Sequence, residues 1–111
     1  MVPRRKLMKG STDSLLLHLI SRQPMYGYQI IKELERKSRG YFKFKEGTLY
    51  PALHRLERAG LILGKWQTLA GGRQRRYYYI TNKGNQILVA KMDQWRDFLA
   101  AMNLIIEPLS T

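Results

Sequence analysis

Residues 45–60 carry the side chains with the clearest capacity for binding chemistry. Read as a helix, this stretch would bury one narrow face, which consists of Leu49, Ala52, Leu53 and Leu56. The opposite face is basic and rich in hydrogen-bonding groups, namely Thr48, Pro51, His54, Arg55 and Arg58, with Tyr50 at its edge. The helix should begin near Gly47, which keeps Pro51 close to its start, and end at Gly60. An ordinary surface helix would show the same pattern, so the surrounding segments decide between a binding face and a solvated one.

The charge of the chain is concentrated in its first two thirds. The 111 residues carry a formal net charge of +12. Residues 1–76 contain 17 lysines and arginines against 5 acidic residues, whereas residues 77–111 contain 3 of each kind. This distribution favours a polyanion as the partner of the first part, and nucleic acid is the usual polyanion for a basic domain. A membrane surface is the weaker alternative, because the basic residues are not gathered on one amphipathic helix.

No residues stand at the spacing of a common enzyme site. The chain has no cysteine, which excludes a disulfide framework and a thiolate metal site and suits a reducing cytosol. His18 and His54 lie in segments of different character, and no phosphate-binding glycine motif is present. No apolar run reaches the roughly 18 residues of a membrane span. We therefore expect a cytoplasmic protein that is not an enzyme and uses no cofactor or metal.

Two helices should precede the central stretch. Residues 1–9 form a basic arm, which either contacts phosphate or only aids solubility. A first helix, capped by Ser11 or Thr12, is apolar around most of its circumference, so we expect a second chain to cover part of it, including Leu16. A second helix should span residues 26–38 with Tyr28 outward. The alternation in residues 41–45 then points Lys43 and Lys45 outward.

A basic hairpin should follow the central stretch. Residues 61–67 and 73–80 are strand-like, and Gly71-Gly72 between them can form the turn. The tip carries Arg73, Arg75 and Arg76. A two-stranded hairpin is not stable alone, so it must pack on the helices before it. Three helices followed by a basic hairpin are typical of a winged helix-turn-helix, a mainly α fold with a small β-hairpin, here predicted for residues 1–81.

A long final helix should begin after Thr81, a good N-cap, and run to about residue 107. Its apolar residues recur at heptad spacing, as Leu88, Met92, Trp95, Leu99, Met102 and Ile106. This spacing predicts a helix–helix seam. We expect residues 82–111 to form a dimerisation helix in one compact unit with the rest, and packing on its own domain is the alternative.

Taken together, these motifs resemble the PadR family of winged-helix transcription regulators over nearly the whole chain. The resemblance is carried by residues 15–17 (LLL), 26–28 (YGY), 47–57 (GTLYPALHRLE), 60–62 (GLI), 72–78 (GRQRRYY) and 81–84 (TNKG). The single C-terminal helix is similar to that of the compact subclass. The resemblance implies a homodimeric repressor that binds operator DNA.

It also implies that some members release DNA when a small aromatic molecule binds. In those members a tryptophan of the last helix lines a pore at the dimer centre, and Trp95 occupies the matching position. Asp13 matches a polar position of the first helix that faces this pore, while Ser14 and Leu99 depart from the hydrophobic and acidic residues expected opposite. A planar aromatic effector is therefore expected near Asp13, Trp95 and Leu99. Close packing of the two Trp95 side chains is the alternative.

These observations predict a sequence-specific, ligand-responsive repressor that binds double-stranded DNA as a homodimer. The predicted DNA contacts are Tyr28, Lys43, Lys45, Thr48, Tyr50, Pro51, His54, Arg55, Arg73, Arg75 and Arg76. A constitutive architectural protein that coats or bends DNA is the main alternative. An RNA-binding adaptor fits the charge, but residues 77–79 are better explained by packing of the hairpin than as a stacking surface.

Overall fold

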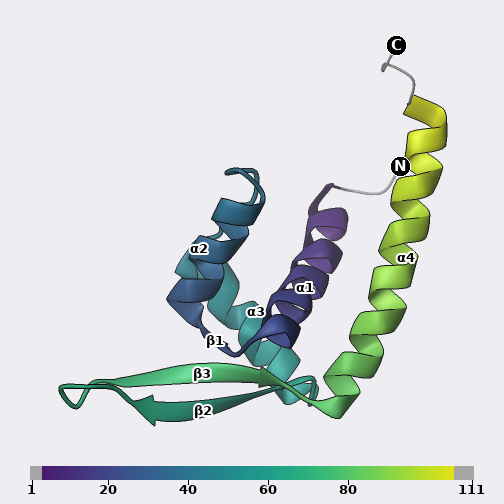
Figure 1. Ribbon diagram of the computed structural model, residues 1–111. Coiled ribbons are helices and arrows are strands. Elements are labelled where there is room, and N and C mark those ends of the chain that lie inside the picture. Colours follow the sequence, from purple (N-terminus) through teal and green to yellow (C-terminus); the bar gives the residue numbers. More distant parts are fainter. Residues whose placement is uncertain (1–3, 107–111) are drawn as a thin grey trace.

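The computed structural model describes the backbone of residues 4–106 and the side chains of residues 10–106. Three helices lie on one side of a small antiparallel sheet, and a fourth, long helix rises from the end of the sheet (Figure 1). The elements in chain order are α1 (Arg4–Arg22), β1 (Met25–Tyr26), α2 (Gly27–Lys37), α3 (Glu46–Arg58), β2 (Ile62–Thr68), β3 (Gln74–Ile80) and α4 (Asn82–Ile106). The predicted winged helix-turn-helix with a long C-terminal helix is confirmed.

The first helix begins earlier than the sequence suggested. It starts at Arg4, so the predicted cap at Ser11 or Thr12 is wrong. Arginine, lysine, leucine and methionine are good helix formers, and they outweigh the cost of Gly10 inside the helix. Residues 1–3 and the side chains of residues 4–9 lie outside the described part, and so do the phosphate contacts predicted there.

The predicted hairpin is part of a three-stranded sheet with the order β1-β3-β2. Met25 and Tyr26 form the extra strand and pair with Tyr78 and Tyr77, so the placement of Tyr26 in the second helix was wrong. Pro24 explains this difference, because it disfavours helical backbone just before it and lets the chain approach β3 in an extended form. The sheet face toward the helices carries buried Met25, Ile62 and Tyr78.

The hydrophobic core lies between α1, α2, α3 and that sheet face. Leu16 and Leu17 of α1 are completely buried in it, together with Ile30 of α2 and Leu53 of α3. Leu16 therefore packs inside the protomer and cannot also face a second chain. The apolar circumference of α1 is explained by contacts on several sides within one protomer, and we withdraw Leu16 from the predicted dimer interface.

The start of α4 is joined to the end of α3. The Thr81 hydroxyl accepts the backbone N–H of Gly84 at 3.0 Å and donates to the carbonyl of Gly60 at 2.6 Å, which confirms Thr81 as the N-cap. A Cβ at position 84 would collide with the carbonyl of Leu61, so the first turn of α4 touches backbone directly. Within the described residues, no helix is long and apolar enough to cross a membrane.

One carboxylate fixes the direction of the hairpin, which we call the wing (β2, β3 and the turn between them). Glu57, near the end of α3, accepts from the Arg76 guanidinium at 2.6 Å and from the backbone N–H of Gly64 at 3.2 Å. A Cβ at position 64 would overlap the Arg76 guanidinium, so a larger residue there would displace Arg76 from its position beside Glu57. Arg76 also lies over the rings of Trp66 and Tyr78. The wing is thus tied to α3 through both of its strands.

Replacing Arg76 with alanine should lower the free energy of unfolding by about 1–2 kcal/mol, because Glu57 would remain partly buried without its cationic partner. Arg73→Ala is the matched control, since Arg73 is exposed on the turn, and should change this free energy by less than about 0.5 kcal/mol. Urea unfolding followed by circular dichroism measures both variants. Equal stability of the two would mean that the Glu57–Arg76 contact does not hold the wing.

Candidate nucleic-acid interface

A groove of about 640 Å³ runs between the start of α2, the outer side of α3 and the wing. Six residues predicted as DNA contacts line it: Tyr28, Tyr50, His54, Arg73, Arg75 and Arg76. They come from three separate segments of the chain, and the fold brings them together. Trp66 also lines the groove and is well exposed, although it was not among the predicted DNA contacts. Strand alternation could have located Trp66 in advance, because it places this side chain on the sheet face toward the helices, together with Ile62 and Gly64.

The outer face of α3 matches the predicted pattern. Thr48, Pro51 and His54 are exposed, and the predicted buried face is buried. The helix begins at Glu46, next to the predicted start. Pro51 therefore lies in its second turn, where the missing N–H affects only the carbonyl of the first turn. The exposed surface at the first turns of α3 is therefore short and polar, without bulky apolar side chains.

Tyr50 is held by a close approach of α2. Its ring covers Gly27, where a Cβ would overlap the ring and hydroxyl, so a larger residue there would displace the Tyr50 side chain. Burial raises the pKa of Tyr50, and the nearby Glu46 carboxylate raises it further. Like other tyrosines, Tyr50 has an O–H group at neutral pH that can donate a hydrogen bond at the groove.

The segment between α2 and α3 presents two lysines outside the groove. Ser38 closes α2, since its hydroxyl donates to the Leu34 carbonyl at 2.7 Å and accepts the Phe42 N–H at 2.8 Å. Phe42 and Phe44 are half-buried against the core, and their rings stack with centroids 6.0 Å apart. Lys43 and Lys45, which alternate with them, are exposed as predicted. They extend the basic surface beyond the groove.

The three wing arginines have different surroundings. Arg73 is exposed beside Gly71 and Gly72, whose positive φ angles form the turn. The Arg75 guanidinium lies 4.2 Å from the centre of the Tyr26 ring, which in turn packs edge-on against Tyr77. Arg76 is paired with Glu57, so its main structural role is to anchor the wing. The strand β1 thus serves to position Arg75.

Arg55 and Asp13, predicted for two different sites, contact each other. An Arg55 terminal nitrogen lies 2.9 Å from an Asp13 carboxylate oxygen, which joins α3 to α1. The Asp13 carboxylate is therefore engaged with α3, and its place in an effector site beside Trp95 stays a prediction. The residue next to Trp95 is Ser14, which is buried and accepts the indole N–H at 3.1 Å. This contact was not foreseen.

The apolar stripe of α4 divides into two parts. Leu88 is buried in the protomer, and Met92 is half-buried against the same core. Trp95 packs edge-on against Phe98 at 5.6 Å. Beyond it Leu99, Met102 and Ile106 are exposed, as are Phe98 and Ile105 beside them. The first part of the stripe therefore packs on its own domain, as the alternative interpretation had it. The second part is not covered by the rest of the protomer.

Comparison with known proteins agrees with this geometry. Residues 16–90 match the model of the transcriptional regulator PadR-like family. A transcriptional regulator of Mycobacterium tuberculosis is 36% identical over 84 residues, which cover 76% of this chain and 75% of that protein. Among solved structures, a transcriptional regulator from Clostridium thermocellum aligns with a TM-score of 0.82 and 29% identity over 96% of this chain and 100% of the other. A PadR-like transcriptional regulator from Bacillus cereus aligns with a TM-score of 0.81 and 28% identity over 93% and 98% of the two chains.

The matched family region includes the last turns of α1, all of α2, α3 and the sheet, and the first turns of α4. It thus contains every residue that lines the groove. The family and the structural neighbours are transcriptional regulators and not enzymes, in agreement with the residue types of the sequence. The chain belongs to the PadR-like family of transcriptional regulators.

Proposed function

We propose that this regulator is a cytoplasmic repressor that binds a pseudo-palindromic operator as a homodimer. The observation that supports it most is the groove, where α3 and the wing present cationic and hydrogen-bonding side chains side by side. In the proposal, residues 1–81 are the DNA-binding part and residues 82–111 form the dimerisation helix.

In the proposal, α3 and the wing on either side of the groove grip one DNA duplex. The outer face of α3, with Thr48, Pro51 and His54, enters the major groove and meets base edges and backbone. Arg73 and Arg75 on the wing reach the adjacent phosphates or minor groove. Tyr28 and Tyr50 line the space between these two elements and can donate hydrogen bonds to phosphate.

Selection of bound genomic fragments tests the proposal. Two-fold symmetry predicts one enriched palindrome with half-sites about 10 bp apart, or a multiple of this spacing. Affinity should fall steeply with salt, as expected for roughly 6–10 phosphate contacts. A flat distribution of fragments would favour the architectural alternative, and binding that does not change between low and moderate salt would exclude both.

The open end of α4 supports the homodimer. Its exposed stripe continues the heptad spacing of the buried part, which is how a helix that serves two interfaces in succession would look. A second copy of α4 supplies the matching stripe, because a two-fold interface places the same residues on both sides. Leu99 lies in the middle of this open stripe.

Leu99→Lys should disrupt the dimer, because it would bury an unpaired charge in the seam. Leu104→Lys is the control, since Leu104 is 85% exposed on the opposite side of the same helix. Analytical ultracentrifugation at micromolar concentration should show a monomer for the first variant and a dimer for the second. A dimeric Leu99→Lys protein would place the interface elsewhere.

Ligand response is the part of the proposal that depends on Trp95. Paired across a two-fold axis, two Trp95 rings could form the walls of a slot for a planar aromatic molecule. The dimer could hold its two α3 helices at a spacing that fits DNA or at one that does not. Such a ligand would release DNA only if it bound the second arrangement more tightly than the first.

Tryptophan fluorescence tests this idea with flat cationic and phenolic aromatics, comparing the wild type with Trp95→Ala. Quenching should disappear in the variant, in which Trp66 remains as an internal control, and a quenching ligand should also weaken DNA binding. Quenching that persists without Trp95, or that leaves DNA affinity unchanged, would make Trp95 a packing residue only.

A further inference from the structure

Arg55 of α3 is held by the carboxylate of Asp13, which lies on a different helix. Asp13 lies on α1, 42 residues before Arg55 in the chain, and the two side chains meet at 2.9 Å. The Arg55 side chain is 40% exposed to solvent and the Asp13 side chain is 23% exposed. The guanidinium is therefore restrained on one side and open to solvent on the other, at the flank of the face that would meet DNA.

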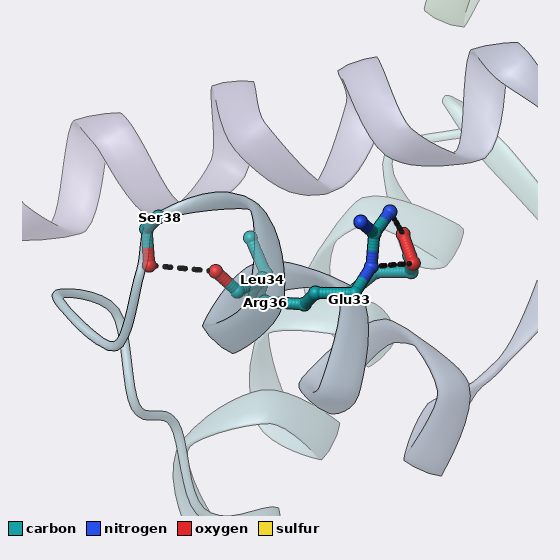
Figure 2. A network of polar contacts seen from close by, with 4 residues as sticks. All are labelled: Glu33, Leu34, Arg36 and Ser38. Carbon is teal, nitrogen blue, oxygen red and sulfur yellow. Dashed lines mark hydrogen bonds and ion pairs between the residues drawn. The ribbon is translucent and has the colours of Figure 1, made fainter.

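The pair differs from an ordinary surface ion pair of the same protein. Glu33 and Arg36 form a bidentate contact within one turn of α2, with nitrogen–oxygen distances of 3.0 and 2.8 Å (Figure 2). That contact is local, and neither residue lines the groove. Asp13 instead reaches across from α1 to a residue of α3. Because pairs this exposed contribute little to stability, the consequence of the Asp13 contact is better sought in DNA binding.

The pairing changes what Arg55 can do to a duplex. A free arginine on a helix face neutralises phosphates of any sequence, and each phosphate neutralised steepens the salt dependence of binding by about 0.9 in log–log slope. A carboxylate at 2.9 Å cancels that charge locally and fixes the direction of the guanidinium. Since this contact uses one of the two terminal nitrogens, other N–H groups of Arg55 remain able to donate.

We propose that Asp13 is a specificity-determining residue, which lowers affinity for unrelated DNA by restraining Arg55. The inference rests on the proposed DNA binding and adds a function for a residue of α1 that does not itself contact DNA. Without the carboxylate, Arg55 reaches phosphates of any sequence, so unrelated DNA gains more than the operator does.

Asp13→Asn is measured on a duplex of unrelated sequence and on the enriched palindrome, over a salt series. Affinity for unrelated DNA should rise, its log–log salt slope should steepen by about 0.9, and the ratio of operator to unrelated affinity should fall. Glu33→Gln is the matched control, because it removes the same charge from another Arg–carboxylate pair, and it should leave the slope unchanged. Circular dichroism verifies that both variants remain folded.

The double variant Asp13→Asn/Arg55→Gln removes both charges and should bind unrelated DNA like the wild type. Weaker binding by this double variant would show that Arg55 already contacts phosphate, and would overturn the inference. An unchanged Asp13→Asn protein, or one that Glu33→Gln matches, would do the same. Absence of salt-dependent DNA binding in the wild type would instead refute the proposed function itself.

Discussion

The contact of Glu57 with the wing sets the geometry on which the rest of the site depends. This carboxylate comes from the last turn of α3 and accepts from Arg76 of β3 and from the backbone of Gly64 in β2. Because the carboxylate has donors on two strands, it fixes the angle between α3 and the wing. A single contact would let the wing rotate about it. Together with the burial of Ile62 and Tyr78 in the core, the Glu57 contact holds the wing beside α3, so that the exposed cations of the groove lie on one surface. Arg76, which stays a predicted DNA contact, also holds the wing through Glu57.

A second set of contacts connects α3 with α4, the helix proposed to hold the dimer. Thr81 caps α4 and at the same time donates to Gly60 at the end of α3, and Gly84 lies against the backbone of Leu61. The first turn of α4 therefore cannot shift without moving the end of α3. On the other side, α1 is hydrogen-bonded to α4 through Ser14 and to α3 through Asp13. A change in how two α4 helices pack would thus be felt at both α3 helices.

Much of this architecture could be predicted from local patterns. The buried face of α3, the alternation of residues 41–45, the glycine turn and the Thr81 cap each follow from short-range spacing, and each is present. The start of α1 was missed because a plausible cap at Ser11 or Thr12 competed with uninterrupted helix formers before it. The strand β1 was missed because two residues have no periodicity of their own and become a strand only by pairing with β3.

The partners of charged residues could not be predicted, because they depend on how elements pack. Nothing near Arg55 in the sequence indicates Asp13, and nothing near Trp95 indicates Ser14. Leu16 was assigned to a second chain because its helix is apolar on several sides. One protomer satisfies all of those sides with α2, α3, α4 and the sheet. Heptad spacing likewise does not reveal that Leu88 packs inside the protomer while Leu99 remains exposed.

In the proposed complex, α3 and the wing of each of two protomers grip one DNA duplex in the same way. Hydroxyl-radical footprinting on the enriched genomic fragment tests it most directly, because it reports protected sugars at single-nucleotide resolution. A two-fold symmetric complex should give two protected blocks related by that symmetry, with centres about 10 bp apart or a multiple of this, on one face of the duplex. Uniform protection along the fragment, or a single block without symmetry, would contradict it.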